Sequence, residues 1–382
     1  MANFLQNLFT SKGEQSVIGI DIGSSSIKVV QLKRRGSQAI LETYGELSLG
    51  PYAETTVGVA TNLSQDKIIE ALHDILTEKD VNITTALCGI AIPFSSSLMS
   101  VVSMPAVSAK ELSTMVPLEA RKYIPVPISE VTLDWSVIPK NNVEGGAMPE
   151  GTTGESAFES KVGPKTGAMM DVLIVAIHND TLARYSAVAA KNNLTPSFFE
   201  IEIFSTMRSV LDDTREPVMI FDMGAATTKL FIVERGILKS SHTINRGSQN
   251  ITESIAKSFG IDEDRAEVMK RDLGLTGHGA ESADILTVSM LTLEYIFEEV
   301  NRIVLDFEKK YEKPISKIIM IGGGASLKGL NEVAKKGFQT EVVSGDPFSK
   351  VVTPAFLEEV LHQTGPQFAV AVGLALRRLE EL

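Results

Sequence analysis

Apolar runs of strand length alternate along this chain with longer segments in which apolar residues recur at helical spacing. Residues 17–33 and 218–236 each form a pattern of two apolar strands joined by a tight turn that contains Gly. A helix is predicted over 64–80, where the first residue is a Ser that can cap it, and a buried strand is predicted over 83–93. This order of hairpin, helix and strand is typical of a mixed α/β sheet layer.

The pattern changes between residues 94 and 193. A β-like stretch precedes a helix predicted over 108–124, in which Ser108 and Glu111 have the spacing of a capping box. Pro117 lies inside this segment and predicts a kink or a break, because proline lacks the amide hydrogen that a helix interior needs.

The rest of that region combines two strands, a helix and a long loop. Alternation predicts a strand over 131–140, with Trp135 as its large buried or interfacial anchor. Residues 141–168 are rich in Gly, Pro, Ser and Glu and nearly free of large apolar residues, which predicts a long mobile loop. A strand and a helix resume over 169–194. Residues 94–193 therefore form a candidate α+β insertion.

The second half of the chain continues the alternation. A short strand leads into a helix over 195–213, directly before the second hairpin. Further helices are predicted over 244–260, 262–274, 284–311 and 366–378. A chain of 382 residues with 43% hydrophobic content can bury large cores, so we expect two lobes.

Composition narrows the function classes. The net charge of −12 argues against nucleic-acid binding, which draws its affinity from clustered Lys and Arg. Cys88 is the only cysteine, so disulfides and Cys-based metal sites within the chain are excluded and a reducing compartment is favoured. No apolar run approaches the roughly 18 to 20 residues of a membrane span, which predicts a cytoplasmic protein. The histidines lack metal-ligand spacing and are taken as structural or surface residues: His73, His178, His242, His278 and His362.

The first twelve residues allow two interpretations. Phe4, Leu5, Leu8 and Phe9 would share one face of a helix, and that face could touch a membrane surface or a partner. The alternative is a frayed terminus, because the segment is too short for a stable isolated helix.

Both hairpins carry Asp-x-Gly, then small or hydroxyl residues, then Lys. The first has Asp21 and Gly23, and the second has Asp222 and Gly224. The glycines permit turn conformations that a side chain would oppose, and the amides of a hairpin tip can then face an anion. One copy alone would be ordinary turn composition. Its recurrence two hundred positions later favours two tips that clamp a polyphosphate from both sides.

A third glycine-rich element, IIMIGGGASLKGL, is an apolar strand followed by three glycines and a helix start. It matches neither a P-loop nor a G-x-G-x-x-G motif. In chain order, the first hairpin, the segment FFEIEIF, the second hairpin, this turn and the closing helix resemble five motifs of the actin-like ATPase superfamily. Those motifs are called phosphate 1, connect 1, phosphate 2, adenosine and connect 2.

Within that superfamily the chain resembles the FtsA/PilM family, whose PilM members act in type IV pilus assembly. The resemblance rests on IGIDIGSSSIKVVQL, LEARKYIPVPISEVTLDW, FFEIEIFSTMRS, INRGSQNITESIA and RAEVMKRDLG. It implies a two-lobed, ribonuclease H-like α/β fold in which an SHS2-like α+β subdomain replaces one of actin's. The implied divisions are a first-lobe core over 1–93, the insertion over 94–193, a return over 194–216, a second lobe over 217–360 with a helical subdomain over about 250–313, and a closing helix over 361–382.

The resemblance also implies ATP between the lobes. Asp21 and Asp222 would face Mg²⁺ through its waters. Glu202 matches the acid that positions metal or water, so these three are the candidate catalytic residues. Phosphate contacts are implied for Gly23, Ser24, Ser25, Ser26, Gly224, Ala225, Ala226, Thr227 and Thr228. Contacts under adenine and phosphates, where a Cβ would intrude, are implied for Gly322, Gly323 and Gly324, with Ser326 beside them.

Other implied contacts have alternatives. Lys28 is either a phosphate contact or an exposed hairpin lysine. Glu267 and Lys270 match a pair that holds ribose and base, but an i, i+3 ion pair on a solvated helix would look the same in sequence. Gly247, in the RGS turn, fits a second-lobe binding segment.

The function implied is an ATP-binding assembly protein of a type IV pilus, secretion or competence machine, with slow or undetectable ATP turnover. Its implied partner is the N-terminal cytoplasmic tail of PilN, bound by the first lobe and the insertion at the inner face of the cytoplasmic membrane. Further candidate partners are the pilus motor ATPases, the platform protein and a second copy of this chain. Two alternatives stay open. The first is an FtsA-like cell-division protein, which a C-terminal membrane helix would favour, and no such helix is expected after RRLEEL. The second is a sugar- or acetate-kinase-like phosphotransferase, which would need a substrate-pocket acid.

Overall fold

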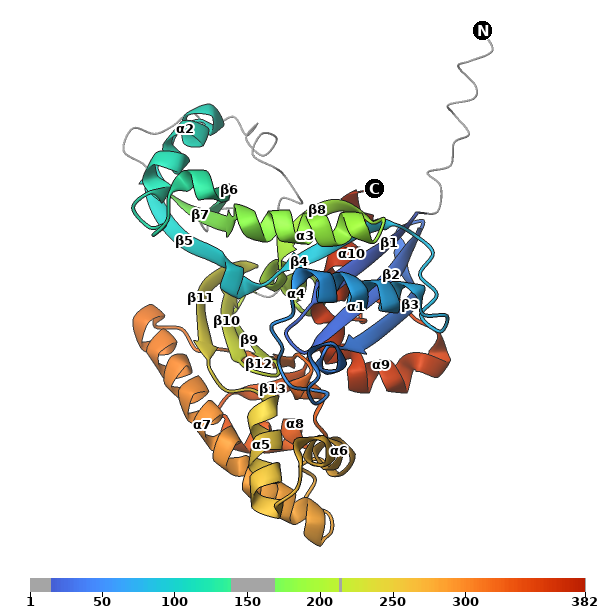
Figure 1. The fold of residues 1–382 in the computed structure, drawn as a ribbon. Coiled ribbons are helices and arrows are strands. Elements are labelled where there is room, and N and C mark those ends of the chain that lie inside the picture. The colour runs from blue at the N-terminus through green and yellow to red at the C-terminus, as the bar shows by residue number, and fades with distance from the viewer. Residues whose placement is uncertain (1–14, 139–168, 213–214, 382) are drawn as a thin grey trace. The chain divides into compact units, whose positions relative to one another are not determined.

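Two hairpins of the same design lie at the centre of two sheets (Figure 1). In this computed structural model, which describes residues 15–138, 169–212 and 215–381, the first hairpin is β1 (Ser16–Ile22) and β2 (Ser26–Arg35). The second is β9 (Val218–Met223) and β10 (Thr228–Glu234). Both pairs are antiparallel, so both predicted hairpins are confirmed.

The six-stranded sheet has the order β14-β3-β2-β1-β4-β8. Its other strands are β3 (Gln38–Ser48), β4 (Leu87–Ile92), β8 (Thr195–Ile201) and β14 (Val351–Val352). Its helices are α1 (Gln65–Thr77), α4 (Glu202–Val210), α9 (Glu358–Thr364) and α10 (Ala369–Glu381). Four consecutive residues of β1, Val17 to Ile20, are buried, so both faces of this sheet are covered. We call this sheet with its helices the first lobe.

The five-stranded sheet has the order β11-β10-β9-β12-β13. Its other strands are β11 (Ile237–Ile244), β12 (Lys317–Ile321) and β13 (Glu341–Ser344). The helices packed beside it are α5 (Ser248–Phe259), α6 (Glu263–Leu273), α7 (Ala280–Tyr311) and α8 (Leu330–Gly337). Phe221, Phe297 and Phe338 lie in one core that joins sheet and helices. We call this sheet with its helices the second lobe.

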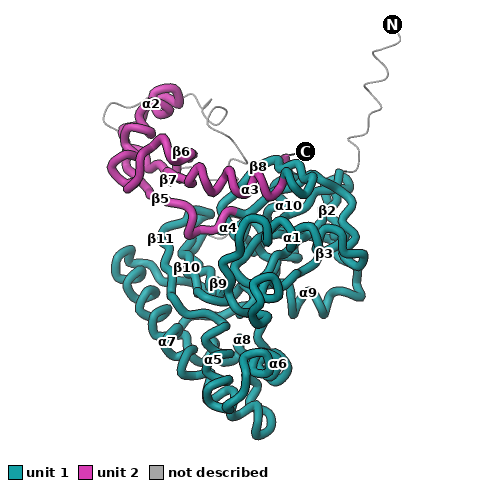
Figure 2. The backbone as a smooth tube through the Cα atoms, viewed as in Figure 1, with its two compact units in different colours: residues 1–91, 190–380, 382 teal, residues 92–189, 381 magenta. Residues whose placement is uncertain are grey.

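Both lobes belong to one structural unit, residues 1–91 and 190–380, whereas residues 92–189 form a second unit (Figure 2). The second unit is described by itself. Its antiparallel sheet has the order β5-β7-β6, with strands β5 (Ser97–Pro105), β6 (Val131–Ile138) and β7 (Met169–His178). Its helices are α2 (Ala109–Ala120) and α3 (Asn179–Lys191). The predicted loop over 141–168 and the amphipathic face in residues 1–12 lie outside the described residues.

Helix α2 tests two local predictions. The capping box is confirmed, because the Glu111 carboxylate accepts from the Ser108 amide at 2.9 Å and Ser108 Oγ accepts from the Glu111 amide at 3.4 Å. A break at Pro117 is wrong, since the helix continues to Ala120. Leu112, Val116 and Ala120 form one buried stripe against the sheet, and this packing holds the helix across the missing hydrogen bond.

Other helix boundaries move for identifiable reasons. Ser64 caps α1 as predicted, with its side chain accepting from the Lys67 amide. The helix predicted from 244 begins at Ser248, because Ile244 still belongs to strand β11 and Gly247 is the N-cap. Within the described ranges, no helix combines the length and apolar character required to cross a bilayer.

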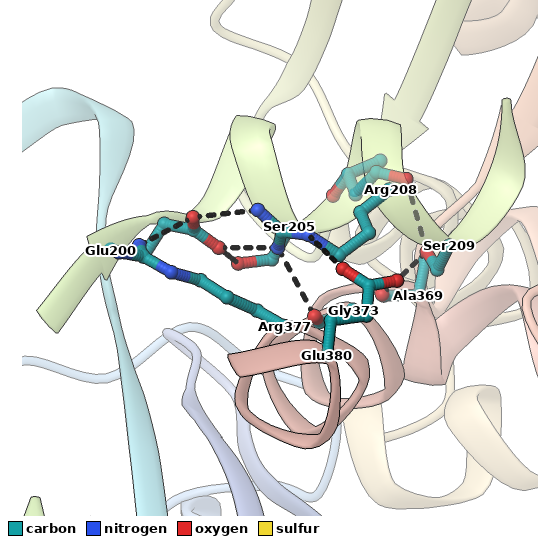
Figure 3. A network of polar contacts seen from close by, with 9 residues as sticks. Glu200, Ser205, Arg208, Ser209, Ala369, Gly373, Arg377 and Glu380 are labelled. Atoms are coloured by element: carbon teal, nitrogen blue, oxygen red, sulfur yellow. Dashed lines mark hydrogen bonds and ion pairs between the residues drawn. The ribbon is translucent and has the colours of Figure 1, made fainter. Parts of the chain in front are cut away.

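A buried polar network fixes α4 against α10 (Figure 3). The Glu200 carboxylate accepts from Arg208 at 2.8 and 2.9 Å and from Arg377 at 2.8 Å. Burial alone would raise the pKa of Glu200, but these guanidinium groups outweigh burial and hold the pKa below its usual range. A Cβ added to Gly373 of α10 would lie 1.8 Å from the Ser205 carbonyl of α4, so only glycine permits this approach. The network therefore sets the position of α4, which begins with Glu202.

Candidate functional site

The tips of the two hairpins have the same hydrogen-bond geometry. The Gly23 amide donates to the Ser26 carbonyl at 3.0 Å, and the Gly224 amide donates to the Thr227 carbonyl at 2.9 Å. Neither glycine has a positive φ. A Cβ would instead lie 3.1 Å from Ser26 O or 3.2 Å from Thr227 O. We expected these glycines to adopt backbone angles that other residues avoid, and this expectation is corrected. Glycine is instead suited here because the backbone atoms on the two sides of the turn lie too close together for a Cβ to fit easily.

Two consecutive carbonyls in each tip are tied to the protein behind it. In the first hairpin, Ser24 O accepts from the Thr61 amide at 2.8 Å and Ser25 O accepts from the Leu49 amide at 2.9 Å. In the second hairpin, the carbonyls of residues 224 and 225 accept, each at 3.0 Å, from the amides of residues 248 and 249 at the start of α5.

This arrangement fixes the direction of the following amides. In a trans peptide the carbonyl and the next N–H point in opposite directions, and the described residues contain no cis peptide bond. The amides of Ser25 and Ser26, and those of Ala225 and Ala226, therefore point away from the segments that hold the carbonyls. Consecutive amides turned the same way form an anion-binding concavity.

Behind each tip an Asp faces a Lys across the hairpin. Asp21 pairs in register with Lys28, and Asp222 with Lys229. Lys28 is 8% exposed, and its Nζ lies 2.6 Å from Ser26 Oγ. The alternative of an exposed hairpin lysine is therefore wrong, and the ammonium group is directed at the tip.

Lys229 is a site residue that the sequence analysis missed. Its Nζ lies 2.5 Å from Glu202 Oε1, so an acid at the start of α4 is joined to the second hairpin. Burial lowers the pKa of Lys229, but attraction to Glu202, Asp222 and Asp21 outweighs burial and raises it. Lys229 could have been identified from the sequence, because it has the same position in the second hairpin as Lys28 has in the first.

The two aspartates lie in one electrostatic environment. Burial raises the pKa of Asp21 to about 6; Lys28 and Lys229 lower it, and Glu202 and Asp222 raise it. Burial also raises the pKa of Asp222, against attraction from Lys229. Asp21 in the first lobe is influenced by Asp222 and Lys229 in the second, and Glu202 of the first lobe lies 2.5 Å from Lys229, so the structure brings the two hairpins together.

Thr228, predicted to contact phosphate, and Gly247, predicted to belong to a second-lobe binding segment, both make contacts within the protein. Thr228 Oγ1 donates to the Arg246 carbonyl at 2.9 Å, and Thr228 is fully buried. Gly247 packs against the second tip, where an added Cβ would lie 2.3 Å from Ala225 O. These two residues therefore support the hairpin from behind.

The three consecutive glycines after β12 differ from one another. A Cβ on Gly322 would lie 2.5 Å from Asp222 Oδ1, and one on Gly324 would lie 2.6 Å from Met223 Cγ. At both positions β9 itself leaves no space for a side chain. This corrects the expectation that all three glycines make room for ligand. Beside Gly323 the nearest atom to a Cβ is Gln367 Oε1, at 3.9 Å, so this side is open. Ser326 Oγ is buried without a hydrogen-bond partner among the described residues.

Glu267 and Lys270 form a buried pair. Their side chains are each 6% exposed and lie 2.6 Å apart. Thr252 Oγ1 lies 2.6 Å from Glu267 Oε2 and 2.9 Å from Lys270 Nζ. Burial would raise the pKa of Glu267, but Lys270 and its hydrogen-bond donors hold it below the usual value. The alternative of a solvated ion pair is therefore wrong.

A family model described as type IV pilus assembly protein PilM matches residues 19–150 and 159–379. The chain belongs to the PilM family. Among curated proteins, the cell division protein FtsA of Escherichia coli K12 is 25% identical over 231 residues, which are 53% of this chain and 54% of FtsA. The chain thus spans about half the length of the curated relatives it matches.

Solved structures similar to this PilM-family chain share its fold. A PilM-PilN type IV pilus biogenesis complex matches with a TM-score of 0.75 and 21% identity, over 95% of this chain and 98% of that one. The ethanolamine utilization protein EutJ of Carboxydothermus hydrogenoformans gives 0.52 and 15%, over 98% and 96%. MreB5 of Spiroplasma citri bound to AMPPNP gives 0.50 and 12%, over 96% and 97%. The predicted actin-like α/β fold is confirmed.

The acidic groups of this PilM-family site fit a hydrated Mg²⁺. Among the residues that the structure describes, no three His, Cys, Asp or Glu are grouped as direct metal ligands. Asp21 and Asp222 instead offer two carboxylates, which suits an ion that keeps several of its waters. Desolvation raises the pKa of both carboxylates, and a cation beside them would offset that effect.

Lys270→Met should destabilise this PilM-family chain far more than Arg271→Met. Both cations contact Glu267 at 2.6 Å, but Lys270 is 6% exposed and Arg271 is 56% exposed. Removing Lys270 takes away the buried cation and leaves Glu267 with only the exposed Arg271, so we expect a loss of about 3 kcal/mol, against less than about 1 kcal/mol for Arg271→Met. Urea unfolding followed by circular dichroism measures both. Equal losses for the two variants would contradict the buried-pair assignment.

Proposed function

We propose that this chain is a nucleotide-operated assembly protein that binds Mg-ATP between the two hairpin tips. The observation that carries the proposal is the repeated tip, in which two tied carbonyls turn two amides the other way in both lobes. Two such concavities, with a buried Lys28 behind one and a half-buried Lys229 behind the other, suit a polyphosphate, whose charge is spread over several oxygens.

Features near the tips support a nucleotide over a simple phosphate. Gly323, in the strand-to-helix turn after β12, has an open side. Glu267 and Lys270 form a buried, preorganised pair of the kind implied to hold ribose and base. The MreB5 structure with a similar fold is bound to AMPPNP, a nucleotide analogue.

The residues at the phosphates favour binding over fast turnover. A bound Mg²⁺ neutralises phosphate charge, and Asp21 and Asp222 would hold its waters. Glu202 could orient an attacking water, but its carboxylate is already paired with Lys229 at 2.5 Å. We therefore expect slow or undetectable ATP hydrolysis.

The proposed partner is the N-terminal cytoplasmic tail of PilN, which would bind to a surface of this protein. The nucleotide state would set the conformation in which that surface is accessible. The similar solved structure is a PilM-PilN complex. In the second unit, a hollow of about 60 Å³ is lined by residues that include Leu98, Tyr123 and Ile124. Through such a partner the protein would be held at the inner face of the cytoplasmic membrane.

Isothermal titration calorimetry tests the nucleotide step. We expect saturable binding of ATP with Mg²⁺ and weaker binding when EDTA removes the metal. Titration of a synthetic PilN tail into ATP-loaded and nucleotide-free protein then tests the coupling, which requires two different affinities. No ATP binding would contradict the proposal. A phosphorylated sugar or acetate formed by the chain would instead support the kinase alternative.

Tyr123→Ala should weaken binding of the PilN tail while leaving ATP binding unchanged. Tyr123 is 50% exposed at the edge of the hollow, and aromatic side chains often carry much of the affinity at such sites. We expect about a tenfold loss in affinity by fluorescence anisotropy of a labelled tail peptide. Leu291→Ala, which removes a 73% exposed side chain from α7, is the control. Equal affinities for Tyr123→Ala and Leu291→Ala would place the tail elsewhere.

A further inference from the structure

The loop between β3 and α1 crosses from one lobe to the other. We call residues 56–61 the strap. At its C-terminal end it is held by the first hairpin, because the Thr61 amide and Thr61 Oγ1 both donate to the Ser24 carbonyl, at 2.8 and 3.0 Å. The strap is thus fixed to a tip that we assign to phosphate binding.

The middle of the strap reaches the second lobe. The Ala60 amide donates to Gln249 Oε1 of α5 at 3.0 Å. Gly58 has a φ of +90°, and a Cβ at this position would lie 2.7 Å from Glu267 Oε1 of α6. Both the backbone angle and the approach to the carboxylate require glycine here. These contacts span the two lobes without any ligand.

The loop leading into the strap is internally braced. The Thr55 amide donates to the Gly50 carbonyl at 3.0 Å, and a Cβ on Gly50 would lie 2.4 Å from Thr56 O. The Tyr52 hydroxyl donates to Asp74 on α1 at 2.5 Å. A braced loop pays little ordering entropy when it contacts α5 and α6, so even a few contacts can hold it there.

We propose that the strap is a latch between the lobes that limits the rate at which nucleotide leaves. Closed, it joins the first hairpin to the two helices that carry Gln249 and Glu267. It is held to the second lobe by the neutral hydrogen bond to Gln249 and by the close approach of Gly58 to Glu267, and neither is an ion pair, so the latch can open and close repeatedly. The nucleotide part rests on the proposed function, whereas the latch itself requires no ligand.

Gln249→Ala tests the latch in nucleotide-free protein. It removes the acceptor of the Ala60 amide and leaves the strap itself unchanged. We expect hydrogen exchange at Ala60 to rise about fivefold to tenfold, the factor that corresponds to losing one neutral hydrogen bond. Gln249→Glu retains an acceptor oxygen and should restore protection. Lys257→Ala, an exposed change on the same helix, is the matched control.

Lobe motion and nucleotide release provide the second readout. Spin labels at Asp66→Cys on α1 and Asp264→Cys on α6 report the interlobe distance, and Cys88 is fully buried and therefore protected from labelling. With Gln249→Ala the distance distribution should broaden, and a fluorescent ATP analogue should leave about fivefold faster. Gly58→Val, which clashes with Glu267, should act in the same direction.

The outcomes separate the two proposals. Faster Ala60 exchange with a broader distance distribution supports the latch, even if no nucleotide binds and the proposed function fails. Unchanged exchange and an unchanged distance distribution in Gln249→Ala, with the thermal stability of the parent protein, would overturn the latch and leave ATP binding untouched. ATP release unaltered in a variant with broadened distances would overturn its control of nucleotide exchange.

Discussion

Asp21→Asn should abolish most Mg-ATP binding and, at the same time, stabilise the nucleotide-free protein at pH 7.5. The carboxylate is proposed to hold the waters of Mg²⁺, and loss of an outer-shell partner typically costs about 10- to 100-fold in metal affinity. Without ligand, however, the same half-buried carboxylate carries a poorly solvated charge, and this desolvation raises its pKa to about 6. Function and stability thus oppose each other at this residue.

The direction of the pH effect follows from proton binding. The ordinary pKa of Asp is 3.8, so between pH 3.8 and about 6 the native state binds more protons at Asp21 than the unfolded state does. Stability therefore falls as pH rises through this window, and the loss is complete above it. Asparagine cannot ionise, so Asp21→Asn should lack this fall and gain roughly 3 kcal/mol at pH 7.5.

Two measurements check this result. Calorimetric titration compares Mg-ATP affinity, and urea unfolding at pH 4.5 and pH 7.5 compares stability. Asp284→Asn, an exposed change on α7, is the control for removing one negative charge. If Asp21→Asn were destabilising at pH 7.5, the carboxylate would be satisfied by its lysines, and the account of a ligand-ready acid would be wrong.

Gly373→Ala should disrupt the fold, whereas Gly323→Ala should affect only nucleotide binding. A Cβ on Gly373 would lie 1.8 Å from Ser205 O, so α10 must move away from α4 and strain the Glu200 network. Backbone has little freedom to yield, and we expect a loss of at least about 3 kcal/mol. Because α4 begins with Glu202, ATP affinity should fall as well.

Gly323 provides the matched comparison. It has helical backbone angles, and the nearest atom to an added Cβ is 3.9 Å away, so alanine fits without strain. The free energy of unfolding of the Gly323→Ala protein should be unchanged or higher by about 0.5 kcal/mol. If adenine or phosphate lies against this open side, ATP binding should weaken. Thermal unfolding and calorimetric titration of both variants decide the matter, and an unchanged Gly323→Ala affinity would place the nucleotide elsewhere.

Local patterns predicted the elements of the fold well. Both hairpins, the Ser64 cap and the capping box of Ser108 depend on residues close in sequence, and all are present. The break considered at Pro117 does not occur, because its helix is held by packing against a sheet whose strands lie far away in the chain. Tertiary packing overrode a local preference there.

The residues of the candidate site were named from the sequence, but the environments of several of them were not predicted. Spacing could not show that Glu267 and Lys270 are buried, because Thr252 and Gly58 reach them from distant segments. The network of Glu200 and Arg377 joins residues 177 positions apart, beyond any periodicity. Lys229 was within reach, since the repeat places it where Lys28 stands in the first hairpin.

A crystal structure of the protein with Mg²⁺ and AMPPNP tests the central claim most directly. The account predicts one nucleotide whose phosphate oxygens accept from the amides of Ser25 and Ser26 in one lobe and of Ala225 and Ala226 in the other, with a hydrated metal facing Asp21. Phosphates bound away from both tips, or contacts to one hairpin only, would contradict it.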